Sequence, residues 1–335
     1  MRLLVLLISS GMLLFSLVTL LDYWRYDEVM QDVAQLMQRD VSAEQVHTQI
    51  EAAIAADSPE NARMYLSIAK TFGHQFDPQR YLPRIEALET PWQQTKRQVS
   101  RFADGFLDGS AESAAGVAGV ITADFTVVGD LRDLNEQYER YQQGQDVNEL
   151  IVTLAGVGVG LTAATVASAG SAAPAKSGVS ALKLAGRSGK LTPKLQRLLL
   201  RQGQSVFDYQ GFMRAVSADR SLVRMQRAAV KAYNPRAVDA LADTAKQVNK
   251  VRESTSLLDT INLLRYVENA DDLRRLQRVS SQYGAQTKGI LKLVGKAGTG
   301  TVRVLRRTTE FFVSLVATAI SLLATLFSVA SFFRR

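Results

Sequence analysis

Cysteine is absent from this 335-residue chain, and histidine occurs only at His47 and His74. The absence of cysteine excludes disulfide bonds, thiolate nucleophiles and thiolate metal ligands. No carboxylate cluster accompanies either histidine, so we expect no metal site, and both are expected to face solvent or cap helices. Neither a nucleophile–base pair nor a metal set can be assembled. We therefore predict no enzymatic activity, no catalytic residue and no cofactor.

Charge is unevenly distributed along the chain. Residues 22–149 have a net charge of −11, residues 176–310 have a net charge of +16, and residues 150–175 have no charge. Such a separation needs a physical reason, and the two sides of a membrane provide one.

The first long apolar run spans residues 3–21 and has no charge. As a helix its 19 residues are about 28 Å long, which is close to the thickness of the bilayer core. Tyr23 and Trp24 follow, where an aromatic belt is expected. A cleaved signal peptide is the alternative, but Asp22-Tyr23-Trp24 is a poor cleavage context. We predict an uncleaved transmembrane anchor.

A second apolar run spans residues 311–333 and predicts another transmembrane helix. Its small residues recur at spacings of three and four, which places them in one stripe. Small side chains let helices approach closely in lipid, so this stripe predicts helix packing, although part of the register can arise by chance. The predicted packing residues are Ser314, Ala317, Ser321, Ala324 and Ser328.

The uncharged stretch 150–175 is rich in glycine and alanine and allows two interpretations. Gly156, Gly160, Ala164 and Ser168 form a small-xxx-small stripe, which is typical of packed transmembrane helices. A third span that needs a partner helix is one interpretation, and a buried helix of a soluble domain is the other. The charge separation favours the span.

This favoured interpretation predicts a threading through the membrane. Arg2 and the N-terminal amine place the N-terminus in the cytoplasm, so residues 22–149 are expected in the periplasm. A crossing at 150–175 then returns the basic residues 176–310 to the cytoplasm. The final residues, Arg334 and Arg335, end outside, which is the one discordant feature.

Residues 22–104 predict an acidic helical domain that contains an αα-hairpin. Ser42 starts one helix, and Ser58-Pro59 ends it and starts the next. Val46 and Ile50 lie on the apolar face of the first helix. A stabilising head domain and a protein-binding module are both compatible with a single hairpin.

Residues 105–149 predict a helical segment with glycine and aspartate turns. Its functional candidates are Asp124, Asp130 and Asp133. Carboxylates beside a membrane helix can line an ion path, and aspartates at such turns can also cap helices. Both roles remain open at this level.

Residues 176–310 predict a basic helical domain. Its positive side chains are expected to face either solvent or anionic lipid headgroups. No nucleic-acid motif and no aromatic stacking platform occurs, so no nucleic-acid partner is expected.

One region resembles a known group of proteins. The resemblance is carried by the segment from Asp124 to Leu134, the Gly/Ala/Thr run that ends at Pro174-Ala-Lys176, and the segment 182–191. Over about residues 105–195 the chain is similar to an uncharacterised family of proteobacterial inner-membrane proteins. The resemblance implies a Gram-negative inner membrane and brings no activity.

Together these observations predict an all-α integral membrane protein. Terminal spans at 3–21 and 311–333, a Gly/Ala-rich span at 150–175 and helical domains between them make up the predicted architecture. The predicted function is non-enzymatic scaffolding or assembly through helix contacts, with a homo-oligomer or another membrane protein as partner. A channel or transporter component that uses residues 105–175 is the alternative.

Overall fold

The computed structural model describes residues 2–23, 26–30, 32–91, 93, 127–216, 221–299, 301–305 and 309–333. The predicted all-α class is confirmed, with one addition, because a two-stranded ribbon accompanies the helices. The chain divides into two compact units. Unit 1 combines residues 1–31 with 301–335, and unit 2 comprises residues 32–300. Asp124 lies outside the described residues.

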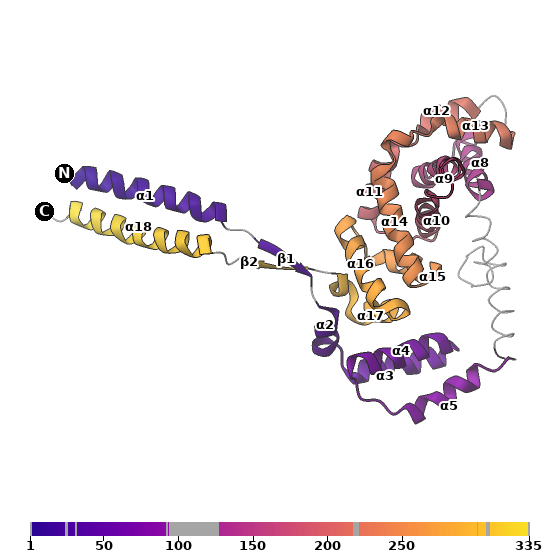
Figure 1. The fold of residues 1–335 in the computed structure, drawn as a ribbon, viewed down its shortest axis with the longest axis horizontal. Helices are drawn as coiled ribbons and strands as arrows, with labels where there is room; N and C mark the ends of the chain where they lie inside the picture. Colours follow the sequence, from indigo (N-terminus) through magenta and orange to yellow (C-terminus); the bar gives the residue numbers. More distant parts are fainter. Residues whose placement is uncertain are drawn as a thin grey trace. The chain divides into compact units, whose positions relative to one another are not determined.

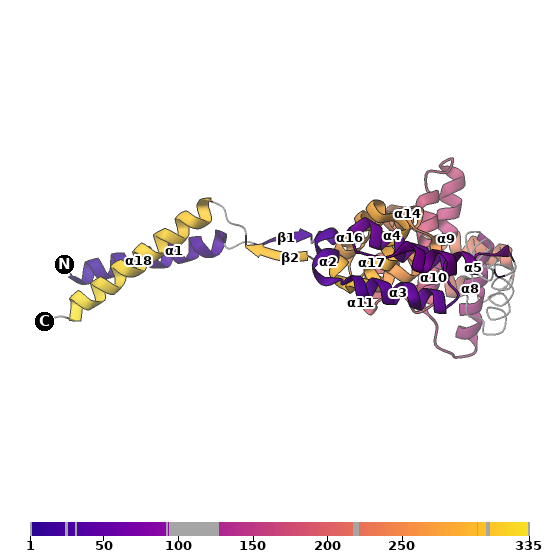
Figure 2. The ribbon, with the colours of Figure 1, turned by 90° about the horizontal axis from the view of Figure 1, so that it is seen from below.

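Unit 1 joins the first and last helices of the sequence. Helix α1 (Arg2–Tyr23) and helix α18 (Thr309–Phe333) lie side by side and antiparallel (Figure 1). They cross in the view of Figure 2. Strands β1 (Tyr26–Met30) and β2 (Thr301–Leu305) pair antiparallel, with Tyr26 opposite Leu305. The sequence did not predict this ribbon, which extends the pairing of the two helices.

Two helices of the described chain, α9 (Glu149–Ala167) and α18, are long and apolar enough to cross a membrane. Their surroundings differ. Only 11% of the apolar window of α18 is buried, whereas 67% of the window of α9 is buried within the protein. In α1 the described apolar stretch Leu7–Leu21 is shorter, and Phe15 is 76% exposed. Exposed apolar surface of the kind that lipid covers therefore lies on unit 1.

The described residues of unit 2 are mainly helical. Its acidic part contains α2 (Val33–Asp40), α3 (Ala43–Ala55), α4 (Pro59–Phe72), α5 (Pro78–Leu88) and α8 (Val127–Gln142). After α9 follow α10 (Ala173–Arg187), α11 (Pro193–Gln204), α12 (Tyr209–Val216), α13 (Leu222–Ala232), η1 (Pro235–Ala237), α14 (Asp239–Ser254) and α15 (Leu257–Leu263). The unit continues with η2 (Leu264–Tyr266), α16 (Ala270–Tyr283), η3 (Gly284–Gln286), α17 (Thr287–Val294) and η4 (Gly295–Thr299).

Helices α3 and α4 form the expected αα-hairpin. Ser42 and Gln45 make a capping box at the start of α3, which satisfies amide groups that have no partner within the helix. Pro59 occupies the first turn of α4, where its missing N–H removes no helical hydrogen bond. Val46 and Ile50 are fully buried. Local sequence therefore specifies this pair closely.

Helix α9 lies in the main core of unit 2. Residues 150–161 are all buried, and α8, α10, α11, α12 and α13 contact the helix. The helix ends at Ala167, and a turn at 168–172 precedes α10, so no single helix spans 150–175. A helix that is apolar on all sides fits either lipid or a protein core. The contacts favour the second of the two interpretations, a buried helix.

A second core joins the acidic and basic parts of the chain. Ile68 of α4 and Ile85 of α5 share this core with Val279 of α16 and Ile290 of α17. Gln286 also donates a hydrogen bond of 2.7 Å to the Ser67 hydroxyl. These contacts require both parts to lie on one side of any membrane. The predicted threading, with 22–149 and 176–310 on opposite sides, is therefore inconsistent with the fold.

Candidate functional site

The contact between α1 and α18 is lined by serines at intervals of seven residues. Ser314, Ser321 and Ser328 of α18 are between 5% and 8% exposed. On α1, Ser9 and Ser16 are buried to the same degree. Two helices with small residues at heptad spacing can bring their backbones close together, which favours packing in lipid.

Threonine hydroxyls connect the two helices directly. Thr318 Oγ1 lies 3.1 Å from the carbonyl oxygen of Ser16, and Thr325 Oγ1 lies 3.0 Å from that of Ser9. The sequence stripe instead predicted Ala317 and Ala324 beside the serines, but both alanines are exposed. Either flank continues a heptad pattern. The threonine flank faces α1. Each of its hydroxyls lies within hydrogen-bond distance of a carbonyl of α1 and also of a carbonyl one turn earlier in α18, at 2.7 Å for Thr318 to Ser314 and 2.8 Å for Thr325 to Ser321.

The predicted small-residue stripe of α9 contacts aromatic side chains in the segments beside neighbouring helices of unit 2. A Cβ atom on Gly156 would collide with the Phe207 ring, and one on Gly160 would collide with the Tyr233 ring. Ala164 is half-buried and Ser168 is exposed at the end of the helix. The two glycines therefore admit aromatic rings, while the second half of the stripe has little packing role.

Two of the predicted aspartates belong to a buried network of ion pairs, which we call the charge ladder. Its members alternate in sign along α8 and α10: Lys176, Asp130, Lys183, Asp133 and Arg187. Lys183 Nζ lies 2.7 Å from Asp130 Oδ1 and 2.7 Å from Asp133 Oδ2, the second contact lacking hydrogen-bond alignment. Lys176 and Arg187 form the two outer contacts.

Burial dominates the electrostatics of the charge ladder. Asp130, Asp133 and Lys183 are completely buried, and Arg187 reaches partial exposure at one end. Burial raises the pKa of the Asp130 carboxyl, and the Lys176 and Lys183 ammonium groups oppose this rise. Removing charges from water is expensive, and a buried ion pair is maintained only when each charge keeps its partners.

Local sequence explains how the charge ladder forms. Lys176, Lys183 and Arg187 are spaced by seven and four residues, so they share one face of α10. Asp130 and Asp133, three apart, share one face of α8. Gly158 of α9 has no side chain, and a Cβ there would collide with the Asp130 carboxylate. The sequence holds one signal that could have predicted the charge ladder: α10 is rich in small residues, yet three cations recur on it at helical spacing.

The described residues do not provide an ion path or a helix cap through these aspartates. Asp130 and Asp133 bond to cations of α10, and neither carboxylate is recorded as capping α8. Among the described residues no group of three or more His, Asp or Glu side chains is arranged to hold a metal.

Both histidines are half-buried, and His47 Nε2 contacts the carbonyl oxygen of Gln75 at 3.0 Å.

The chain matches no family model, no curated protein and no solved structure. The resemblance to proteobacterial inner-membrane proteins stays a prediction.

Proposed function

We propose that this chain is a non-enzymatic membrane-anchored scaffold, held in the bilayer by the paired helices α1 and α18. One observation carries the proposal: the two most exposed apolar helices are the ones that pair with each other through small residues and hydroxyl-to-carbonyl bonds. Such pairing is the usual means of joining helices in lipid, where no hydrophobic force acts between them.

Antiparallel pairing determines the threading that we propose. If α1 and α18 cross the bilayer together, residues 1 and 335 share one side and residues 24–308 share the other. The ribbon β1–β2 supports this arrangement because it continues from the same ends of the two helices. The proposal therefore has two spans, with α9 inside the protein core.

The orientation follows from the basic residues near the membrane. Positive residues close to a span favour the cytoplasm. Three Lys/Arg residues lie at the end of the pair that carries residues 1 and 335, and five lie within about 15 residues of the other end: Arg25, Lys296, Arg303, Arg306 and Arg307. We therefore place residues 24–308 in the cytoplasm at the inner membrane, and both short ends in the periplasm.

Besides the bilayer core around α1 and α18, we propose anionic lipid headgroups as a partner of unit 2. Helix α13 exposes Arg227 and Lys231 together with Leu222 and Val223. The structure records no ion pair for either of these two cations within the described residues. A helix that exposes both apolar and basic side chains suits the surface of a membrane with anionic headgroups, where each cation contributes about 1 kcal/mol.

The alternative of a channel or transporter component receives less support. It needs accessible carboxylates, yet Asp130 is enclosed by Lys176 and Lys183 in a closed core. The segment 105–126 and Asp124 lie outside the described residues.

Membrane fractionation tests the anchor. Full-length protein should stay in the pellet after alkaline carbonate extraction and dissolve only with detergent. Ser9→Leu with Ser16→Leu should disturb the pairing of the helices, and Gly11→Leu, at a position with open space around it, is the matched control. Recovery of the unmodified protein in the carbonate supernatant would contradict the proposal.

A further inference from the structure

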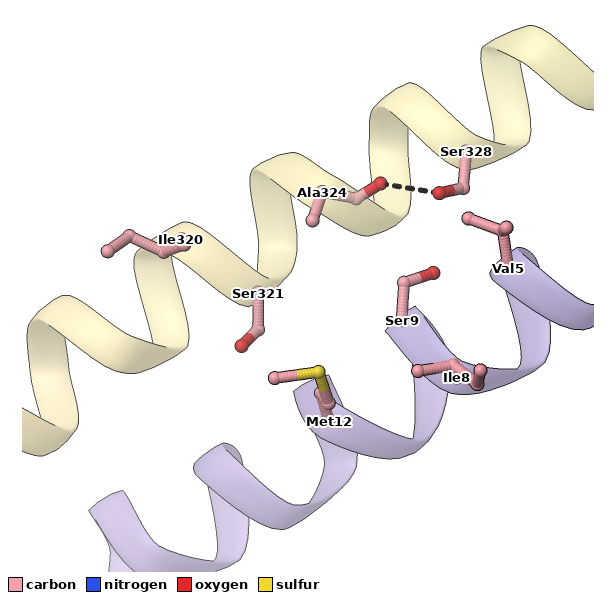
Figure 3. A pocket seen from close by; sticks show the side chains of 8 residues that line it. All are labelled: Val5, Ile8, Ser9, Met12, Ile320, Ser321, Ala324 and Ser328. Carbon is pink, nitrogen blue, oxygen red and sulfur yellow. Dashed lines mark hydrogen bonds between the residues drawn. The ribbon is translucent and has the colours of Figure 1, made fainter.

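The two helices of unit 1 leave an apolar groove along one side of their contact. The groove has a volume of about 250 Å³ and is lined by Val5, Ile8, Ser9, Met12, Ile320, Ser321, Ala324 and Ser328 (Figure 3). Figure 3 shows Ser321 and Met12 facing each other from the two helices. Residues of both predicted spans line the groove, so in a bilayer it is filled either by lipid or by another helix.

One hydroxyl in the groove differs from its neighbours. Ser314 and Ser328 donate to carbonyls of their own helix, and the Thr325 hydroxyl lies within hydrogen-bond distance of both the Ser9 carbonyl of α1 and the Ser321 carbonyl of its own helix. Ser321 is 8% exposed, and its hydroxyl makes no recorded hydrogen bond within the described residues. Hydrocarbon offers no partner for such a group, whereas a backbone carbonyl of an adjacent helix does.

The uncovered flank of α18 supplies the matching surface. Ala317 and Ala324 lie seven residues apart, on the side of the serine row opposite to Thr318 and Thr325, and α1 leaves both alanines exposed. Helix α18 thus has two small-residue flanks. The threonine flank is used within the chain, and the alanine flank is continuous with the groove.

We propose that the groove binds helix α18 of a second copy of this chain, which makes the anchor a symmetric dimer. A two-fold axis along the membrane normal brings the alanine flank of each α18 against the same flank of the other, as an isologous interface requires. Each α18 then occupies the groove of its partner, and the Ser321 hydroxyl reaches a partner carbonyl. This inference rests on the proposed membrane anchor.

Disulfide crosslinking in native membranes tests the dimer without interference, because the chain has no cysteine of its own. Ala324→Cys should give a disulfide-linked dimer on mild oxidation. The matched control is Leu326→Cys. Leu326 lies two residues away on the opposite face of the helix and is 57% exposed, and this variant should remain monomeric. Equal crosslinking of both variants, or of neither, would overturn the proposal.

Second-site variants separate specific packing from chance collision. In the Ala317→Cys background, Ala324→Leu should reduce crosslinking at least tenfold, because the larger side chain fills the groove. Ser321→Ala should weaken association about threefold, since one interhelical hydrogen bond is lost. Unchanged crosslinking in Ala324→Leu, or an adduct with the mass of a different protein, would argue against a second copy.

Carbonate extraction of the same membranes tests the membrane anchor separately from the dimer interface. Cysteine variants that stay in the pellet yet form no dimer refute the interface and leave the anchor intact. A lipid acyl chain in the groove would give this result at every protein-to-lipid ratio. Variants that appear in the supernatant would refute the anchor itself.

Discussion

Thr325 of α18 donates a hydrogen bond of 3.0 Å to the carbonyl oxygen of Ser9 in α1, which lies 316 positions earlier in the sequence. Two helical turns away, the Thr318 hydroxyl makes the same contact with the carbonyl oxygen of Ser16. These two contacts fix the register of the helix pair, and several expected outcomes depend on it.

The register of the pair predicts one specific intramolecular disulfide. Ser16→Cys combined with Thr318→Cys should crosslink within the monomer under mild oxidation, because the two positions face each other. Ser16→Cys combined with Val316→Cys is the control, since Val316 is 56% exposed and lies on another face. Mobility on non-reducing gels after cleavage between the two helices reads the result. Preferential crosslinking of the control pair would show a different register.

Sidedness can be measured with single cysteines and a membrane-impermeant maleimide. Gln143→Cys and Lys250→Cys are exposed, and both should label only in inverted vesicles. Arg335→Cys should label only in spheroplasts. The three-span threading instead places positions 143 and 250 on opposite sides, so opposite labelling of these two would restore it.

Breaking the charge ladder should strongly destabilise unit 2. Lys183→Met leaves the buried carboxylates of Asp130 and Asp133 without their shared cation, and we expect a loss of about 3–5 kcal/mol in unfolding free energy. Lys246→Met removes an exposed ion pair with Asp243, and we expect less than about 1 kcal/mol. Urea unfolding of the full chain in detergent compares them. Similar losses in both variants would mean that the ladder is not structurally important.

Two glycines of unit 2 should respond to alanine in opposite directions. Gly158→Ala places a methyl group on the Asp130 carboxylate, and we expect a loss of about 1–3 kcal/mol. At Gly186 the added Cβ meets Ile151, Leu150 and Leu191 only at 3.5–3.6 Å. Because alanine favours a helix, Gly186→Ala should stabilise by up to about 1 kcal/mol. Thermal unfolding measures both, and a stabilising Gly158→Ala would contradict the close packing.

Glu268 should contribute a pH dependence at the acid end. Hydrogen bonds from Lys194 and Lys296 lower the pKa of Glu268 to about 2. A lowered pKa stabilises the fold above the ordinary value of 4.5, and this contribution is lost as the pH falls from 4.5 towards 2. Glu268→Gln should therefore be less stable than the parent at neutral pH, and the difference should shrink below pH 4.5. A difference that does not change with pH would exclude this ion pair as its cause.

Local signals specify the individual helices well. The cap residues Ser42 and Pro59 mark where α3 and α4 begin, and the uncharged runs mark α1 and α18, because these signals act within one or two helical turns. The register between α1 and α18 was beyond the sequence. Ala324 and Thr325 flank the same serine row, and only the position of Ser9 in the other helix distinguishes them.

The location of α9 is the clearest limit of the sequence argument. A helix that is apolar on all sides has the same sequence pattern whether lipid or protein surrounds it. Gly156 and Gly160 suggested close packing, but their partners, the Phe207 and Tyr233 rings, lie in other parts of the chain. Some of the opposite charges of the two halves pair with each other within the core, as those of Asp130 and Lys183 do.

The pairing of the first and last helices also sets the order of events during synthesis. The 285 residues between Tyr23 and Thr309 must be made before α18 exists. At 5–20 residues per second this takes roughly 15–60 s. During that interval a newly made α1 has no partner helix, and the carbonyl oxygens of Ser9 and Ser16 lack the threonine hydroxyls that α18 provides. A premature stop codon anywhere upstream of α18 would leave a lone α1, whereas a full-length product brings its own partner.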